Sequence, residues 1–160
     1  MMRTPPFNLH LPATVSEAIQ ISSDLRDSGK DSDWVAGGTD ILPNYKWHIN
    51  SKTDVISLAR IPEINNVSKT EFGAMVRLST LADDGITHPL IAQAAAKGAS
   101  KLIRNNATLG GNKCLDTRCF WFNQSEDLRS SIDWCLKCDC GTGADCRVIP
   151  YQNELCVATY

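Results

Sequence analysis

The sequence predicts an α+β fold of two lobes, and three observations lead to this prediction. Short apolar strands alternate with helical segments over residues 7–64, which predicts an α/β lobe. Two Gly-Gly pairs, at residues 37–38 and 110–111, interrupt the pattern. All seven cysteines lie within residues 113–156, where regular periodicity ends. The second, α+β lobe is expected over residues 65–160 and includes this cysteine-rich segment.

The N-terminal α/β lobe is expected over residues 1–64 and begins with a helix at residues 15–21. Thr14 precedes this helix and Glu17 occupies its third position, which is the arrangement of a capping box. Apolar runs bounded by glycine, proline and polar residues then predict a strand, a short helix and a second strand, at residues 33–36, 41–47 and 54–58. Strand, turn, helix and strand in this order form a small βαβ-like unit.

The second lobe has a weaker pattern. Val67 and residues 75–78 are typical of edge or hairpin strands, with Gly73 as the turn. A run rich in small apolar residues predicts a helix over residues 88–100. From Phe120 onward no clean periodicity remains. A segment with so little regular pattern needs another source of order, and a metal centre is one that a cysteine-rich segment can provide.

Composition and charge limit the classes of function. The 160 residues are 42% hydrophobic and 21% charged, with 16 basic and 18 acidic side chains and a net charge of −2. This balance offers no basic surface to a nucleic-acid backbone, so no nucleic-acid partner is expected. No apolar run approaches the roughly 20 residues that span a bilayer, so no membrane partner is expected. The first residues lack an apolar signal core, and a cytoplasmic location is expected.

Both Gly-Gly pairs belong to candidate cofactor-binding segments. Residues 36–40 directly follow a predicted strand, and a turn there exposes backbone N–H groups that can bind a pyrophosphate, with the Thr39 hydroxyl as a further donor. Residues 108–112 have the same pattern. An ordinary loop explains either segment alone, and the G-x-G-x-x-G spacing of a Rossmann fold is absent. Together the two segments could hold one extended dinucleotide from two sides.

The cysteines allow two kinds of metal site. A wide set has 15, 10 and 9 residues between its members, and its four thiolates can hold a [4Fe–4S] cluster: Cys119, Cys135, Cys146 and Cys156. A dense set could bind zinc, although its Cys-x-Cys pair fits a zinc site poorly: Cys135, Cys138, Cys140 and Cys146. Clustered thiols in a reducing cytoplasm more often bind metal than form disulfides. The spacing alone does not decide between the two sets.

No pattern for acid–base or nucleophilic catalysis is present. His10, His48 and His88 are not close in sequence to a cysteine or to an acidic pair, so surface or core-edge roles are expected for them. The sequence contains no Ser/His/Asp arrangement and no Walker loop. We therefore name no catalytic residue.

Three segments, taken in order, resemble the FAD-binding subunit of the molybdenum hydroxylases, the superfamily of xanthine dehydrogenase and carbon monoxide dehydrogenase: residues 35–43, 58–64 and 103–112. The resemblance implies a two-lobed FAD-binding domain of the molybdopterin dehydrogenase (PCMH-type) kind. It also implies that both Gly-Gly segments contact FAD. The residues that match the family in this way are Val35, Ala36, Gly37, Gly38, Thr39, Asp40, Ile41, Thr108, Leu109, Gly110, Gly111 and Asn112.

The cysteine-rich insert is similar to that of one branch of the superfamily, the β subunit of 4-hydroxybenzoyl-CoA reductase. The similarity lies in residues 114–119, 123–126 and 135–137. It implies an inserted loop that carries a [4Fe–4S] cluster near the flavin, with the wide set as its ligands: Cys119, Cys135, Cys146 and Cys156. Cys114 matches a position that is not a ligand. Cys138 and Cys140 are additional to the pattern and could compete with Cys146.

The resemblance implies an electron-transfer subunit of a heterotrimeric complex. Low-potential electrons, with a ferredoxin as the donor, would pass through the cluster and FAD to [2Fe–2S] centres on a small subunit, and then to a molybdenum cofactor on a large subunit. The implied reaction is the reductive removal of a phenolic hydroxyl group from an aromatic CoA thioester. Because family members continue well past Tyr160, the domain is expected to be incomplete at its C-terminus.

Three other interpretations stay open. An FAD subunit of a different molybdenum hydroxylase, such as a xanthine or CO dehydrogenase, would pass electrons outward to NAD or a quinone. A zinc-stabilised binding module would have no redox role. A truncated chain could also be a non-functional remnant. The visible absorption of the purified protein tests the zinc interpretation, because flavins and iron–sulfur clusters absorb visible light and zinc does not.

Overall fold

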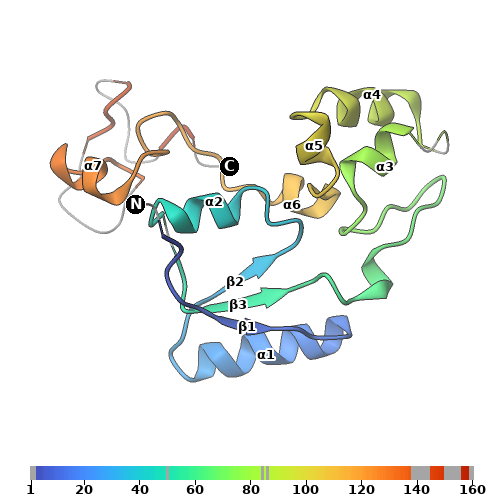
Figure 1. Ribbon diagram of the computed structural model, residues 1–160, viewed down its shortest axis with the longest axis horizontal. Coiled ribbons are helices and arrows are strands. Elements are labelled where there is room, and N and C mark those ends of the chain that lie inside the picture. Colours follow the sequence, from blue (N-terminus) through green and yellow to red (C-terminus); the bar gives the residue numbers. More distant parts are fainter. Residues whose placement is uncertain are drawn as a thin grey trace. The chain divides into compact units, whose positions relative to one another are not determined.

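The computed structural model (Figure 1) describes residues 3–49, 51–83, 85, 87–137, 145–149 and 156–158. The chain consists of two compact units. The sheet unit comprises Pro6–Leu42 and Lys52–Cys114, and the cysteine unit comprises Met1–Pro5, Pro43–Ser51 and Leu115–Tyr160. Both Gly-Gly pairs belong to the sheet unit, and every cysteine except Cys114 belongs to the cysteine unit. The lobe boundary at residue 64 stays a prediction.

A three-stranded parallel sheet is the centre of the sheet unit, with strand order β1-β3-β2. Its strands are β1 (Asn8–His10), β2 (Ser32–Val35) and β3 (Asp54–Ser57). The middle strand, β3, buries Val55 and Ile56 completely. The parallel pairing of β2 with β3 confirms the expected βαβ-like unit. The short strand β1 was not predicted, because three residues of mixed polarity carry no periodic signal.

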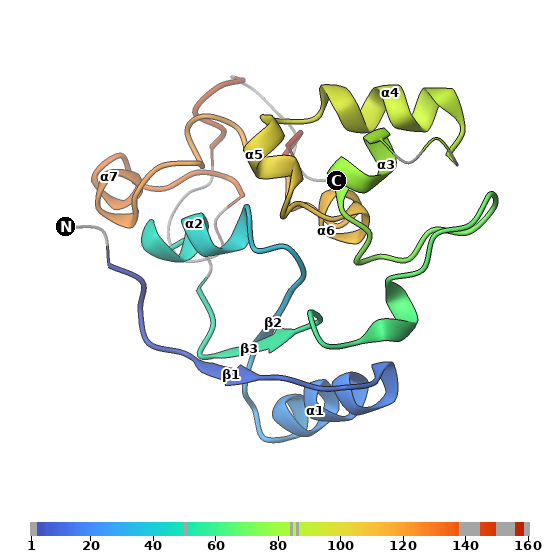
Figure 2. The ribbon, with the colours of Figure 1, turned by 45° about the vertical axis from the view of Figure 1, so that its right-hand side comes forward.

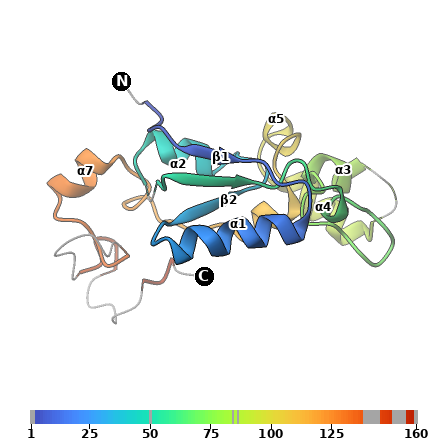
Figure 3. The same cartoon turned by 90° about the horizontal axis from the view of Figure 1, so that it is seen from below.

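Helix α1 (Val15–Asp27) covers one face of the sheet (Figure 3). Thr14 caps it as predicted, because the Oγ1 atom of Thr14 accepts a hydrogen bond from the N–H of Glu17 at 3.1 Å. The Glu17 carboxylate accepts from the N–H of Ala13 at 2.7 Å. Ala18 is buried in the core that α1 forms with the sheet, and Leu25 packs against the same core. The helix ends later than predicted because its apolar stripe continues through Leu25.

Four further helices of the sheet unit lie together in Figure 2: α3 (Leu78–Asp83), α4 (Pro89–Lys97), α5 (Lys101–Arg104) and α6 (Leu109–Lys113). Their shared core consists of Val76, Leu78, Leu81, Ala95 and Ala107. The helix predicted over residues 88–100 ends at Lys97, because Ala99 has a positive φ of 53°, which a continuous helix does not allow. The Arg104 guanidinium donates to the carbonyl oxygens of Gly98 and Ala99 and so holds the break in place.

The predicted hairpin forms only in part. Val67 and Phe72 make an isolated antiparallel bridge, so the turn lies between these two residues and not at Gly73. Residues 75–78 contain only one isolated antiparallel bridge, between Arg77 and Thr108, and Leu78 already begins α3. The apolar side chains that follow are three residues apart, and this spacing suits a helix better than a strand.

The cysteine unit contains helix α7 (Glu126–Ser131), and α2 (Ile41–Lys46) ends in it. Arg129 of α7 is buried, and its guanidinium lies 5.2 Å from the ring centroid of Phe122 and 5.3 Å from that of Trp134. It donates to the backbone oxygens of Gln124 at 3.2 Å and His48 at 3.1 Å. Burial lowers the pKa of Arg129. This buried cation orders a segment in which no regular pattern predicted a helix. None of the described helices is long and apolar enough to cross a membrane.

Candidate functional site

A cavity of about 440 Å³ opens at the carboxyl ends of β2 and β3. Ligands of parallel sheets bind at this edge, because the loops that leave neighbouring strands converge there. Ala36 and Gly37 follow β2, and residues 59–62 follow β3 and lead into the short helix η1 (Pro62–Ile64). The complete lining, all from the sheet unit, is Ala36, Gly37, Ala59, Arg60, Ile61, Pro62, Asn65, Met75, Arg77, Asn106 and Thr108.

The two Gly-Gly segments meet beside this cavity. A Cβ atom added to Gly37 would lie 2.0 Å from the backbone oxygen of Asn106, so only glycine lets these two backbone segments approach this closely. A Cβ atom added to Gly111 would lie 3.5 Å from the Cβ atom of Ala36. The missing side chain at Gly37 therefore allows its backbone to approach that of Asn106, just before the second Gly-Gly segment, whereas a Cβ atom at Gly111 would make only an ordinary contact with Ala36.

The second Gly-Gly segment begins helix α6 and is not a turn. Thr108 is the N-cap residue, and its Oγ1 atom accepts from the N–H of Gly111 at 3.2 Å. The N–H of Gly110 donates to the carbonyl oxygen of Ala74 at 2.7 Å. Every backbone N–H from residue 109 to residue 112 has an acceptor within the chain. The expected cradle of free backbone donors is therefore absent from residues 109–112.

The first Gly-Gly segment is a turn with free donors. Gly38 has a φ of 70°, a left-handed conformation that glycine adopts without strain. Within the described part of the chain, the backbone N–H groups of Gly37, Gly38 and Thr39 have no hydrogen-bond acceptor. Successive N–H groups in a turn form a concave site that attracts an anion. Because Gly37 also lines the cavity, this site lies at the cavity wall.

Two arginines add positive charge to the same cavity. Arg60 follows β3, Arg77 precedes α3, and both line the cavity. Neither guanidinium group pairs with a carboxylate or a carbonyl oxygen among the described residues. Guanidinium groups bind phosphate oxygens through pairs of parallel hydrogen bonds. Free N–H groups and two available guanidinium groups give the cavity the chemistry that a diphosphate requires.

The structure separates the predicted cofactor-binding residues into groups. Those that line the cavity are Ala36, Gly37 and Thr108. The others are sequence neighbours of these three residues: Val35 ends β2, Ile41 begins α2, residues 38–40 complete the turn, and residues 109–112 belong to α6. Sequence reasoning missed both arginines. The position of Arg60 just after a predicted strand was a usable signal for it, whereas Arg77 has no local signal.

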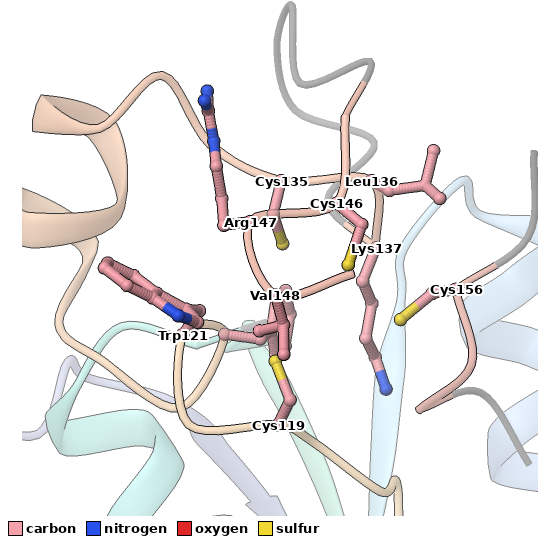
Figure 4. Close-up of a pocket in the computed structure, with 10 residues that line it drawn as sticks. Cys119, Trp121, Cys135, Leu136, Lys137, Cys146, Arg147, Val148 and Cys156 are labelled. Atoms are coloured by element: carbon pink, nitrogen blue, oxygen red, sulfur yellow. The ribbon is translucent and has the colours of Figure 1, made fainter. Parts of the chain in front are cut away.

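Four cysteine side chains line a second cavity, within the cysteine unit (Figure 4): Cys119, Cys135, Cys146 and Cys156. All four are free thiols, and Figure 4 shows their sulfur atoms around a common space. Two of the sulfur atoms accept backbone hydrogen bonds. The N–H of Ile149 donates to Cys146 at 3.3 Å, and the N–H of Ala158 donates to Cys156 at 3.4 Å. The structure thus brings the wide set of cysteines together.

Four thiolates are a ligand set for a [4Fe–4S] cluster and equally for a structural zinc ion, and the two differ in how close the sulfur atoms must lie. Zinc holds each thiolate at about 2.3 Å, so its ligands crowd together, whereas a cluster distributes four thiolates over four iron atoms. Among the described residues, no group of three or more Cys, His, Asp or Glu side chains is close enough to hold one ion. The enclosed space is about 10 Å³, so a cluster requires the thiols to move apart. Cys138 and Cys140 lie outside the described residues.

Known proteins resemble the sheet unit over most of its length. The family described as "FAD binding domain in molybdopterin dehydrogenase" matches residues 5–119. The carbon monoxide dehydrogenase medium chain of Hydrogenophaga pseudoflava is 30% identical over 118 residues, which are 69% of this chain and 40% of that protein. The xanthine dehydrogenase FAD-binding subunit of Escherichia coli O157:H7 is 29% identical over 113 residues, which are 66% of this chain and 37% of that protein.

A solved structure shares the fold. Carbon monoxide dehydrogenase from Hydrogenophaga pseudoflava lacking the Mo-pyranopterin moiety matches with a TM-score of 0.61 and 29% identity, over 70% of this chain and 40% of that chain. The present chain thus spans about 40% of the length of its relatives. The family match ends at Cys119, so three of the four cavity cysteines lie beyond it. The match over residues 5–119 and the shared mixed helix and sheet fold show that the chain belongs to the family of FAD-binding domains in molybdopterin dehydrogenases.

Proposed function

We propose that this chain is the FAD-carrying, electron-transferring part of a molybdenum-containing oxidoreductase. One observation carries the proposal: the cavity of the sheet unit combines free backbone donors with two available guanidinium groups, in a chain of an FAD-binding family. The names of its relatives agree with this function, because they describe a carbon monoxide dehydrogenase medium chain and a xanthine dehydrogenase FAD-binding subunit.

The first Gly-Gly segment would hold the diphosphate of FAD. The N–H groups of Gly37, Gly38 and Thr39 would donate to phosphate oxygens, as free N–H groups in a turn do in other anion sites. Arg60 and Arg77, which line the same cavity, would neutralise the phosphate charge. The bound flavin would supply the redox chemistry, and the chain would position it.

The second Gly-Gly segment would act mainly by shaping the cavity. Thr108 lines the cavity, but its hydroxyl oxygen already accepts from the helix that it caps. Gly110 allows α6 to pack closely against Ala74, because a Cβ atom added at Gly110 would lie 2.7 Å from the Cβ atom of Ala74 and 2.8 Å from its carbonyl oxygen. Residues 109–112 would therefore fix the position of the first segment and not bind phosphate through their backbone.

The four cysteines of the second cavity would hold a [4Fe–4S] cluster, as the resemblance to the β subunit of 4-hydroxybenzoyl-CoA reductase implies. The support from this chain is that the same four thiols line one cavity and that two of them accept backbone N–H groups. Hydrogen bonds to the sulfur atoms of a cluster are among the features that set its reduction potential. The cluster would exchange single electrons with the flavin.

Two complexes are candidates for the complete enzyme. The cysteine cavity favours a 4-hydroxybenzoyl-CoA reductase-like complex, in which a ferredoxin would donate electrons for the removal of a phenolic hydroxyl group from an aromatic CoA thioester. The names of the relatives favour a xanthine or CO dehydrogenase-like complex, in which electrons would leave through the flavin. In both, a [2Fe–2S] small subunit and a molybdenum cofactor large subunit would be the partners, in the cytoplasm.

Metal and flavin analysis of the chain, purified without oxygen, tests the proposal. Bound FAD with about four iron and four sulfide per chain is the result expected of a flavin and [4Fe–4S] protein. FAD without iron would favour the xanthine or CO dehydrogenase-like alternative. Zinc without flavin or sulfide would contradict an electron-transfer function. Cys119→Ala should lose the cluster and Cys114→Ala should keep it, and the reverse result would show that the ligand assignment is wrong.

A further inference from the structure

Lys137 places a positive charge among the four cysteines of the second cavity. It follows Cys135 by two residues and lines the same cavity as the four thiols. Its side chain is only 11% exposed, although lysine is rarely buried without a partner. Figure 4 shows the side chain running past Cys156. A nearly buried ammonium group must be paired, and its partners indicate what it does.

The ammonium group of Lys137 is bound to the segment around Cys119. It donates to Oδ1 of Asp116 at 2.5 Å and to the backbone oxygen of Thr117. It also lies 5.3 Å from the ring centroid of Phe122, within the range of a cation–π contact. Lys137 therefore ties its own segment, which carries one proposed ligand, to the segment that carries another.

Among the described residues, one carboxylate pairs with the ammonium group of Lys137, and that carboxylate is well exposed. This partner, Asp116, is 54% exposed, so water screens the carboxylate far more than it screens the ammonium group. Arg118, which is 8% exposed, lies 3.9 Å from the other oxygen of the same carboxylate. Arg147 also lines the cavity, but its guanidinium donates to two backbone oxygens at 3.0 Å and points away from the sulfur atoms (Figure 4).

We propose that Lys137 positions two ligands of the [4Fe–4S] cluster and raises its reduction potential. The inference rests on the proposed cluster site. A cluster with four thiolate ligands becomes more negative by one charge when it is reduced. A fixed positive charge in a poorly hydrated site stabilises the more negative state, so the potential rises. The bonds to Asp116 and Thr117 keep this charge at a fixed place beside the cavity.

Reduction potentials of variants test this role. The chain is purified without oxygen, its iron and sulfide are measured, and its potential is determined by a redox titration followed by electron paramagnetic resonance. Lys137→Gln should shift the potential to more negative values, and Lys137→Arg should keep it near the wild-type value. Asp116→Asn removes the opposing charge and should shift the potential in the positive direction. Lys52→Gln, which breaks an exposed ion pair with Asp31, should cause no shift.

The outcomes separate this role from the cluster assignment. A cluster-containing wild-type protein whose potential is unchanged by Lys137→Gln and by Asp116→Asn would overturn the role of Lys137 and leave the proposed function intact. Loss of the cluster in Lys137→Gln with retention in Lys137→Arg would support the positioning role, and the Asp116→Asn shift would then test the effect of charge. A wild-type chain without iron would overturn the cluster site itself, and the role of Lys137 with it.

Discussion

The two Gly-Gly segments have the same sequence pattern but different structures. Residues 37–39 form a turn with free N–H groups at the carboxyl end of β2, whereas residues 109–112 form the start of α6 with every N–H bonded. In the first segment the backbone is available to a ligand. In the second, Gly110 allows helix α6 to pack closely against Ala74. The pattern alone therefore does not decide whether the N–H groups of such a segment are available to a ligand, and the hydrogen-bond partners of each N–H do.

Gly37→Ala is expected to have the largest effect on stability and on FAD binding. The added Cβ atom would lie 2.0 Å from the backbone oxygen of Asn106, which cannot rotate away as a side chain can. The free energy of unfolding should fall by about 3 kcal/mol, at the upper end of overpacking effects. FAD binding should be lost with it. Urea unfolding and FAD fluorescence titration measure the two effects.

Gly111→Ala is the matched control for this change. Its Cβ atom would lie 3.0 Å from the side-chain oxygen of Thr108 and 3.5 Å from the Cβ atom of Ala36, both of which can adjust. Alanine also favours a helix over glycine by up to about 1 kcal/mol. The free energy of unfolding should stay within about 1 kcal/mol of wild type. Equal losses of stability in the two variants would show that the two segments do not differ as described.

The next largest effect is expected for the arginines of the cavity. Arg60→Gln and Arg77→Gln should each raise the Kd of FAD about tenfold, which corresponds to about 1.4 kcal/mol. The effect should shrink as salt is added, because both side chains are exposed. Arg26→Gln, at the end of α1, is the control and should leave the Kd unchanged. Unchanged affinity in both cavity variants would remove the arginines from the proposed site.

A smaller effect is expected for Thr108→Val, which removes the cap of α6. The free energy of unfolding should fall by about 1 kcal/mol, because the N–H of Gly111 loses its acceptor. The Kd of FAD should change less than in the arginine variants. Ser100→Ala, which removes the cap of α5, should destabilise the chain similarly without any effect on FAD. A greater loss of FAD affinity in Thr108→Val than in Arg60→Gln would assign the diphosphate to the second segment.

The smallest expected effect concerns the sheet from which the first segment extends. The hydrogen bond from His10, with others from Thr53 and Asn8, holds the pKa of the buried Asp54 carboxyl below its ordinary value of 3.8, although burial opposes this shift. The stability that Asp54 contributes is therefore present above pH 3.8 and is lost as the pH falls below it. In thermal unfolding, Asp54→Asn should lower the Tm at neutral pH and lose this difference in acid.

Local signals predicted the first part of the fold well. The Thr14 cap involves a residue three positions away, and each of the strands β2 and β3 has its own local apolar pattern. These local patterns were sufficient to predict the cap and the strand pair. The helix at Gly110 depends on a contact with Ala74, which the sequence around the glycine does not reveal. Helix α7 depends on a buried Arg129 whose acceptor at His48 is distant in the chain.

The same distinction applies to the two cavities. The resemblance to the reductase β subunit indicates the wide set of cysteines as cluster ligands, whereas their spacing alone allows a zinc site as well. Their convergence on one cavity is a property of the folded chain. Arg77 lines the cavity at the carboxyl ends of β2 and β3 beside Thr108, with which it forms a bridge, and no local pattern predicts such a pairing.

Amide chemical shifts test the central claim most directly, because a chain of 17.6 kDa is suited to two-dimensional NMR. FAD is titrated into the ¹⁵N-labelled chain while the amide signals of both segments are followed. The account predicts large, saturating downfield shifts for Gly37, Gly38 and Thr39, whose N–H groups are free, and small changes for Gly110 and Gly111, whose N–H groups are already bonded. Large shifts at Gly110 and Gly111 with unchanged signals from residues 37–39 would contradict it.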